Sequence, residues 1–413
     1  MRILYINTTD VSGGAAVVMQ RLMRGLHEKY GTENRLLVKE KQGSSPATEA
    51  ILSGKAEIIL EKALNRIGHL TGLLYQSFPF SSSNILKFTR QYKPDIINLH
   101  NVQGGYFAVP LLLKISAIAP VVWTLHDMWS FTGNASHTFG NMSWKYLKND
   151  PALAKIQPSI GINTGAWLLK QKKRIYHNTR LSIVTPSCWL KELAEQSPVF
   201  VGKNIFHIFN GVDTTVFYSG GKETARQKLG IPVNNKTIMF SSHFLNKNNP
   251  WKGGADLLDI LGKINAATNE KINLLMTGEG SIQELDGFTK FNVFNKGYIK
   301  EEAGMRDCYT AADLFIYPTR ADNLPNVLVE SIACNTPCIT FDIGGNKEIV
   351  QHDFNGILIQ PFDHAAFAGK TLALLNNKDR LDGLSANCSF VTKKHFLLEE
   401  MVKNYFTLFK TLV

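Results

Sequence analysis

The main candidates for functional residues are two carboxylates, Asp322 and Glu330, which stand eight positions apart in the sequence. Asp322 lies in 318–325, whose two prolines, threonine, arginine and asparagine are typical of a loop. Glu330 lies in NVLVESIA, where apolar residues recur at helical spacing. A fixed carboxylate can accept hydrogen bonds from both hydroxyls of a ribose, which suits Glu330, and Asp322 could accept from sugar hydroxyls. The alternative for Glu330 is a charge that only suits the first turn of a helix, worth ~0.3–1 kcal/mol.

Several other positions suit a bound phosphate. Lys252 precedes a Gly-Gly pair and a predicted helix, where a lysine opposes the helix dipole unless an anion lies between them. Glycine turns after predicted strands, and the amides that open the 326–333 helix, can also face an anion or a nucleotide. These further candidates are Gly13 and Gly14, Gly278 and Glu279, Gly297 and Tyr298, and Asn326 and Val327. The alternatives are an exposed loop lysine and glycines that only turn the chain, and no G-x-G-x-x-G dinucleotide fingerprint is present.

Two histidines each follow an apolar segment. His126 and Asp127 come directly after VVWTL, and His100 comes directly after DIINL. A histidine at the carboxyl end of a strand can orient a substrate hydroxyl or stabilise developing charge, so His126 is a catalytic candidate. The alternative for either residue is an imidazole that only bonds a loop carbonyl.

The elements that must position these residues alternate between apolar strands and amphipathic helices. The strands are apolar throughout, which indicates parallel sheets covered on both faces. The pattern restarts in the second half of the chain, so we predict an α/β protein with two Rossmann-like domains that face each other across a deep cleft. The predicted domains are 1–205 and 206–390, with a loop-rich hinge in 206–230. A C-terminal helix, 391–413, is expected to pack back on the first domain.

Composition narrows the class of protein. The chain has 413 residues, 44% of them hydrophobic, and a formal net charge of +11. It has no apolar run of transmembrane length, no signal-peptide layout and no C-x-x-C among five cysteines, so we expect a cytoplasmic protein without a metal site. The sequence contains no zinc finger, RNP motif or helix-turn-helix signature, so no motif indicates binding to nucleic acid. The basic surface could bind an anionic membrane or phosphate-bearing substrates, or it could be a solvated surface without a partner.

The segments PDIINLHNVQGGY, VVWTLHDMWSFTG and ADNLPNVLVESIACNTPCITFDIGG together resemble the retaining glycosyltransferases of family 4 (glycosyl transferases group 1), which have the GT-B fold. The resemblance is strongest to members of the colanic-acid and capsular-polysaccharide type. That family carries two glutamates in an E-x7-E motif, which stands here as Asp322 and Glu330. The resemblance implies that Glu330 binds the nucleotide ribose and that the shorter Asp322 contacts the donor sugar.

The same resemblance assigns the remaining candidates. His126 corresponds to a catalytic histidine on the acceptor side, and Asp127 and His100 are expected to contact the acceptor. Lys252 corresponds to the lysine that neutralises the donor diphosphate. The nearest candidate for its basic partner is Lys247.

The sequence therefore predicts a hexosyltransferase that moves a sugar from a nucleoside-diphosphate sugar to a saccharide or lipid-linked saccharide acceptor, in surface polysaccharide synthesis. No cofactor is expected. Because the chain has no D-x-D, we expect a metal-independent reaction, in which Lys252, helix N-termini and glycine amides balance the leaving charge. The resemblance implies retention, with front-side displacement as the working mechanism. The alternatives are a nucleotide-sugar epimerase of the same layout and a non-catalytic sugar-binding protein. The base and the sugar of the donor are left open.

Two segments of the first half suggest contact with an anionic membrane at the inner face of the plasma membrane. The segment 56–78 is amphipathic, and 168–178 is basic. The apolar face is predicted to contain Ile58, Ile59, Ala63, Ile67, Leu70 and Leu74, beside Lys62 and Arg66, and the basic segment contributes Lys172, Lys173 and Arg174. The alternative is a helix packed on its own domain.

Overall fold

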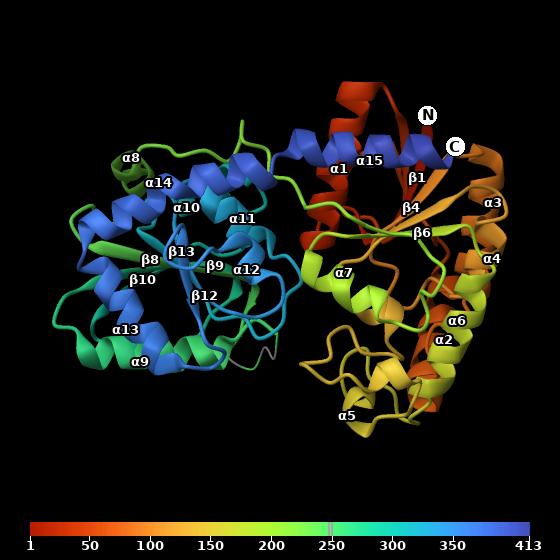
Figure 1. Cartoon of the computed structure of the whole chain (residues 1–413), viewed down its shortest axis with the longest axis horizontal. Coiled ribbons are helices and arrows are strands. Elements are labelled where there is room, and N and C mark those ends of the chain that lie inside the picture. Colours follow the sequence, from red (N-terminus) through yellow and green to blue (C-terminus); the bar gives the residue numbers. More distant parts are fainter. Residues whose placement is uncertain (247, 249–250) are drawn as a thin grey trace. The chain divides into compact units, whose positions relative to one another are not determined.

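A computed structural model describes residues 1–246, 248 and 251–413. The chain divides into two compact units, one formed by 1–209 with 399–413 and the other by 210–398. Each unit contains one sheet whose paired strands are all parallel (Figure 1). The fold class predicted from the sequence, α/β with two parallel sheets, is therefore confirmed.

The first unit contains a seven-stranded sheet in the order β3-β2-β1-β4-β5-β6-β7. Its strands are β1 (Arg2–Thr9), β2 (Glu33–Glu40), β3 (Thr48–Ala50), β4 (Ile96–Leu99), β5 (Val121–Thr124), β6 (Leu181–Thr185) and β7 (Ile205–His207). Its helices are α1 (Gly14–Tyr30), α2 (Lys55–Thr71), α3 (Pro79–Tyr92), α4 (Leu111–Ile115), α5 (Pro151–Ala154), α6 (Gly165–His177), α7 (Cys188–Glu195) and the C-terminal α15 (Leu398–Leu412), with the 3-10 turns η1 (Trp129–Phe131) and η2 (Ser143–Tyr146).

The second unit contains a six-stranded sheet in the order β10-β9-β8-β11-β12-β13. Its strands are β8 (Lys236–Leu245), β9 (Ile272–Gly280), β10 (Phe291–Asn295), β11 (Leu314–Tyr317), β12 (Cys338–Phe341) and β13 (Gly356–Ile359). Its helices are α8 (Lys222–Lys228), α9 (Gly254–Ala267), α10 (Glu302–Ala311), α11 (Asn326–Ala333), α12 (Asn346–Ile349), α13 (His364–Leu375) and α14 (Lys378–His395), with the 3-10 turn η3 (Gln283–Gly287). The segment predicted as a loop-rich hinge thus also contains α8.

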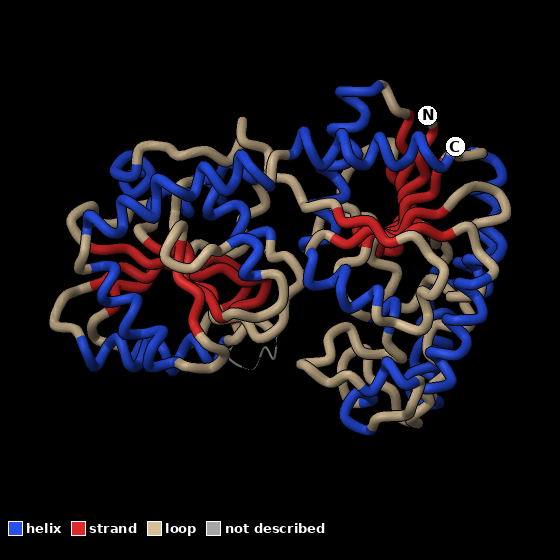
Figure 2. The backbone as a smooth tube through the Cα atoms, viewed as in Figure 1, coloured by secondary structure: helices blue, strands red, loops and turns tan. Residues whose placement is uncertain are grey.

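The central strands are buried on both faces, which explains their apolar sequences. All residues of β4, β5, β11 and β12 are buried. Figure 2 shows helices on both sides of each sheet. This is the arrangement that parallel sheets require, because their crossover helices cover both faces.

The C-terminal helix α15 packs against elements of the first unit. The ring of Phe406 stacks on Tyr30 at the end of α1, with 3.7 Å between ring centroids. The Tyr405 hydroxyl lies 2.9 Å from the hydroxyl of Thr124, the last residue of β5. The last turns of the chain therefore support the strand that leads into the histidine segment.

Helix α2 presents most of its apolar residues outward. Of the six residues predicted to form its apolar face, Ile59, Ala63, Ile67 and Leu70 are exposed and Ile58 is half-buried. Leu74 is buried and lies beyond the end of the helix, so its assignment to the apolar face of the helix was wrong. Among the described helices, none combines the length and the apolar character that are needed to cross a membrane.

Candidate active site

The two histidines of the first unit meet at the carboxyl edge of its sheet. His100 follows β4 and His126 follows β5, two neighbouring parallel strands. Parallel strands end at the same edge of a sheet, which brings the two rings together. His100 Nδ1 lies 3.0 Å from His126 Nε2, and the rings stack with 5.2 Å between centroids.

The protonation pattern of this pair follows from Asn98. The Asn98 side-chain amide donates to the Val122 carbonyl oxygen at 2.9 Å, which turns Oδ1 toward His100 Nε2, 3.0 Å away. His100 Nε2 must therefore carry the hydrogen, and His100 Nδ1 accepts the hydrogen bond from His126 Nε2. In the neutral pair, His126 Nδ1 is consequently left as a hydrogen-bond acceptor.

Both rings are neutral at pH 7. Burial lowers the pKa of His126 to about 4. Burial and the neighbouring His126 lower the pKa of His100 well below its usual value. His126 Nδ1 can therefore accept a hydrogen bond from a hydroxyl group, and the ring is a weak base at neutral pH.

Asp127 uses both carboxylate oxygens within the unit. Its Oδ1 accepts the backbone N–H of Trp129 at 2.8 Å, and its Oδ2 accepts the side-chain amide of Gln103. Burial raises the pKa of Asp127 to about 6, although these two hydrogen bonds lower it. Asp127 thus ties the loop after β4 to the turn after β5, beside the histidine pair.

Lys172 was predicted to belong to an exposed basic surface, and that prediction was wrong. Its side chain is buried and donates to the carbonyl oxygens of Trp129, Thr132 and Gly133 at 2.5, 2.9 and 3.3 Å. The ammonium also lies 3.9 Å from the centre of the Trp129 ring. These carbonyls need donors because the segment after His126 is irregular and buried, so Lys172 stabilises the histidine loop.

The glycine turn after β1 opens α1 as predicted. Gly13 is the N-cap at φ 87°, and the cap has no side-chain hydrogen bond to the first turn. Asp10, which the sequence analysis did not single out, is buried at the same turn. It accepts the backbone amides of Gln42 at 2.8 Å and Gly43 at 2.9 Å and so fixes the loop after β2.

In the second unit, the predicted catalytic residues Lys252 and Asp322 form an ion pair. Lys252 Nζ lies 2.5 Å from Asp322 Oδ2 and 3.0 Å from the hydroxyl of Tyr317, the last residue of β11. The Tyr317 hydroxyl in turn donates to the same Asp322 oxygen at 2.7 Å. Burial opposes the charge on Lys252, but Asp322 and Tyr317 together raise its pKa well above the usual value. Tyr317 was missed because nothing in an apolar strand marks its last residue as part of a site.

Close backbone contacts hold the two loops of this cluster together. Gly253, at φ 67°, lies so near Pro318 that a Cβ atom would be 1.8 Å from the Pro318 carbonyl oxygen. Gly344, at φ 60°, leaves equally little room, since a Cβ atom would be 1.9 Å from the Asp322 carbonyl oxygen. A glycine at position 344, after β12, is therefore needed to let the Asp322 loop approach.

Glu330 and the start of α11 form a second group. Glu330 is 7% exposed, and its Oε2 accepts the Tyr309 hydroxyl at 3.2 Å. The helix begins at Asn326, and its N-cap residue, Pro325, makes no side-chain hydrogen bond to the first turn. Asn326 and Val327 thus open a helix whose N-terminus is suited to an anion.

The remaining donor-side candidates meet at the ends of β9 and β10. The Gly278 amide donates to the Gly297 carbonyl oxygen at 2.9 Å. Tyr298 is exposed, and its ring lies edge-on to His243 with 5.1 Å between centroids. Glu279 is exposed on β9. Lys247 lies outside the described residues.

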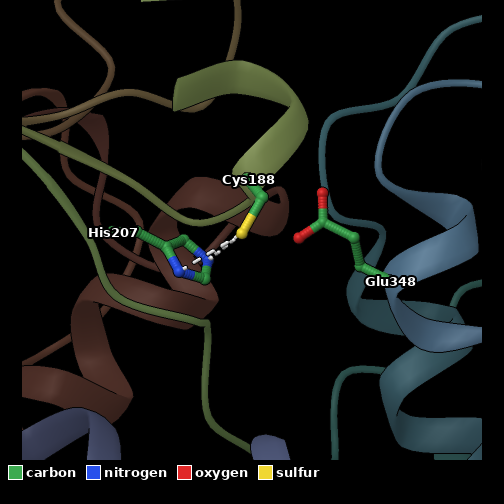
Figure 3. Close-up of side chains that lie close together, drawn as sticks. All are labelled: Cys188, His207 and Glu348. Atoms are coloured by element: carbon green, nitrogen blue, oxygen red, sulfur yellow. Dashed lines mark hydrogen bonds between the residues drawn. The ribbon is translucent and has the colours of Figure 1, made fainter. Parts of the chain in front are cut away.

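Cys188 and His207 form a separate pair in the first unit. Figure 3 shows the Cys188 thiol pointing toward the imidazole, with 3.6 Å between Sγ and Nδ1. Glu348, drawn in the same figure, belongs to α12 of the second unit. Two ligands fall short of the three or four that protein zinc sites use, so this pair by itself does not make a metal site.

Comparisons with known sequences match both units. The family model for Glycosyltransferase Family 4 matches residues 12–216, and the model for Glycosyl transferases group 1 matches residues 235–377. The chain is 24% identical over 381 residues to the putative colanic acid biosynthesis glycosyl transferase WcaC of Escherichia coli, covering 85% of each protein. It is 25% identical over 320 residues to a D-inositol 3-phosphate glycosyltransferase of Thermobispora bispora, covering 74% of this chain and 68% of the relative.

Solved structures share the fold over the whole chain. Sucrose-phosphate synthase from Thermosynechococcus elongatus superimposes with a TM-score of 0.71 at 15% identity, covering 100% of this chain and 98% of that one. HepE from Anabaena, solved with UDP-glucose, superimposes with a TM-score of 0.67 at 18% identity and covers 100% of each chain. The two family models, which between them match both units, show that this chain belongs to the family 4, group 1 glycosyltransferases with the GT-B fold.

Proposed function

We propose that the chain transfers a hexose from a nucleoside-diphosphate sugar to a saccharide or lipid-linked saccharide, without a metal ion and with retention of configuration. The observation that carries the proposal is the Lys252–Tyr317–Asp322 cluster of the second unit. The cluster brings the Lys252 cation and the Asp322 carboxylate together beside the end of β11. A sugar diphosphate needs both groups, because a cation can bind its phosphates and a carboxylate can accept hydrogen bonds from its sugar hydroxyls. HepE, which shares the fold, binds UDP-glucose, and WcaC supports a role in surface polysaccharide synthesis.

Each residue has a defined task in this reaction. Glu330 accepts the ribose hydroxyls, and the first amides of α11 bind a phosphate. Lys252 leaves part of its pairing with Asp322 to neutralise the diphosphate, and Asp322 then accepts from the donor sugar. His126 holds a hydroxyl group through Nδ1, the nitrogen that the His100 contact leaves open.

Retention follows from a front-side displacement. The acceptor oxygen bonds to the anomeric carbon on the face from which the bond to the diphosphate breaks. The hydroxyl proton passes to the leaving phosphate oxygen, so no protein base with a pKa near 7 is needed. This route suits His126, whose pKa of about 4 makes it a poor proton acceptor at neutral pH.

The metal-independent reaction predicts that activity survives chelation. Purified chain incubated with a panel of UDP-, GDP- and ADP-sugars should release one class of nucleoside diphosphate at the same rate with and without excess EDTA. The measurement is nucleotide release by chromatography, with NMR of the product to read the anomeric configuration. Activity that disappears in EDTA and returns with Mn²⁺ would contradict charge neutralisation by Lys252, and an inverted product would contradict the front-side route.

We also propose that the enzyme works in the cytoplasm, at the inner face of the membrane. All five cysteines are free thiols, which suits a reducing compartment. Ile59, Ile67 and Leu70 of α2 are 66%, 53% and 62% exposed, and Lys62 and Arg66 lie among them on the same helix. An apolar stripe flanked by cations fits an anionic lipid surface.

Binding to anionic vesicles should therefore depend on the apolar stripe of α2 and on the exposed cations Lys173 and Arg174 of α6. Replacing Ile59 and Ile67 with Ser, or Lys173 and Arg174 with Ser, should each weaken cosedimentation, the charge pair by roughly 30-fold at ~1 kcal/mol per cation. A control with the same charge change, Lys370 and Lys378 to Ser on exposed positions of the second unit, should bind as the wild type does. Equal binding to neutral and anionic vesicles would leave no role for the basic residues.

A further inference from the structure

The first unit contains a cavity of about 220 Å³ whose lining includes none of the proposed catalytic or donor-binding residues. It lies between the inner side of α2, the ends of β2 and β3, and the loop after β4. Its apolar lining includes Ile51, Leu52, Ile58 and Tyr106. Lys62 is among its polar lining residues.

The cavity shares a loop with the histidine pair. Gly105 and Tyr106 line the cavity, and Gln103 of the same loop donates to Asp127, which directly follows His126. The Tyr106 hydroxyl donates to the Asn101 carbonyl oxygen at 2.8 Å, which holds the loop in shape. Several residues that line the cavity therefore lie at or just after the carboxyl ends of β2, β3 and β4, the edge of the sheet at which His126 also lies.

Most of the charges near the cavity are already accounted for. Glu61 is 2% exposed, and its carboxylate accepts a hydrogen bond from the backbone amide of Ser81 at 2.7 Å. Ser81 lies in the first turn of α3, and the N-cap residue of that helix makes no side-chain hydrogen bond. Glu40 pairs with Lys39 at 2.9 Å. Lys62 is exposed and has no ion-pair partner among the described residues. The lining therefore combines an apolar part, formed by Ile51, Leu52, Ile58 and Tyr106, with the cation of Lys62, which is available to an anionic ligand.

Helix α2 connects this cavity with the exposed apolar stripe. Ile58 and Lys62 line the cavity, while the neighbouring Ile59 and Leu60 do not line it and are 66% and 51% exposed. A helix that is apolar on its outer side and lines an aliphatic cavity on its inner side suits a ligand that is itself partly apolar. Ile51, Leu52 and Ile58 contribute branched aliphatic side chains to the lining, against which an alkyl chain can pack.

We propose that this cavity is an acceptor subsite that holds the aliphatic part of an amphiphilic acceptor, with an anionic group of that acceptor beside Lys62. The inference rests on the proposed transferase function and specifies its acceptor. The same chemistry would come from a lipid-linked phosphate or from a free alkyl phosphate, and the alkyl chain would be removed from water in either case.

The test is a calorimetric titration of the full chain with butyl, pentyl and hexyl phosphate, each below its micelle concentration. Each added methylene should tighten binding roughly four-fold while the cavity still has room. Ile58→Trp fills the cavity and should weaken hexyl phosphate at least ten-fold. Ile59→Trp makes the same change one residue along α2, outside the cavity, and should bind as the wild type does.

Three further measurements complete the test. Leu52→Trp fills the cavity from a second side, so it should reproduce the loss if Ile58→Trp unfolds the helix. Lys62→Gln should weaken hexyl phosphate and leave hexanol unchanged. Affinity independent of chain length, or equal losses in Ile58→Trp and Ile59→Trp, would overturn the proposal. Nucleoside-diphosphate binding should survive in all these variants, and its absence from the wild type would instead overturn the transferase function.

Discussion

Lys252→Ala is expected to lower the rate of sugar transfer by roughly 10²–10³-fold, the usual cost of removing one preorganised group that stabilises developing charge. Asp322 and Tyr317 already hold the Lys252 ammonium in place. We propose that the leaving diphosphate gains its negative charge beside this ammonium. The measurement is kcat and kcat/KM from nucleotide release. Both should fall, because the interaction grows stronger in the transition state.

Lys263→Ala is the matched control for this change. Lys263 lies on α9, the helix that Lys252 precedes, and forms an exposed pair with Asp259 at 3.6 Å. Its removal should leave both kinetic constants within a factor of two. If Lys252→Ala raised KM alone and left kcat intact, Lys252 would serve binding only, and its catalytic assignment would fail.

Glu330→Ala should weaken the binding of free nucleoside diphosphate by roughly 10- to 150-fold, since a buried charged hydrogen-bond partner is worth ~1.5–3 kcal/mol. Asp322→Asn should have the opposite selectivity. It releases Lys252 from its ion pair, so free nucleoside diphosphate should bind as tightly as before or more tightly. The intact sugar donor should bind more weakly, because we propose that Asp322 accepts hydrogen bonds from the sugar. Calorimetry with both ligands separates the two effects.

Glu301→Ala, at an exposed glutamate of the same unit, is the control and should change neither affinity. Glu330→Gln keeps an acceptor oxygen and should lose less affinity than Glu330→Ala. Unchanged nucleotide binding in both Glu330 variants would remove the ribose assignment, and weaker nucleotide binding in Asp322→Asn would place Asp322 on the phosphates instead of the sugar.

Local elements could be read from the sequence because their signals are local. The segment NVLVESIA was predicted as a helix and forms α11, Asn326–Ala333, and the apolar segment DIINL contains β4, Ile96–Leu99. In both cases the apolar spacing and the flanking loop residues agree with the burial that the tertiary structure imposes. Parallel pairing then brings strand ends together, so the positions of His100 and His126 at one sheet edge could also be expected.

Roles that depend on distant partners could not be read in the same way. Asn98 fixes the hydrogen positions of both histidines, yet its partner Val122 is 24 residues away and on another strand. Tyr317 joins Lys252 to Asp322 only because β11 ends beside both loops. Lys172 did give a signal that was overlooked: it lies at helical spacing with Leu168 and other buried residues of α6, on the face that turns inward.

The most direct test of the central claim is an experimental structure of the full chain with its preferred nucleoside diphosphate, prepared in EDTA. The account predicts the ribose hydroxyls within hydrogen-bond distance of the Glu330 carboxylate and a phosphate oxygen within that distance of Lys252 Nζ, with no metal ion on the diphosphate. A nucleotide bound away from both residues, or a diphosphate that binds only through a metal ion, would contradict it.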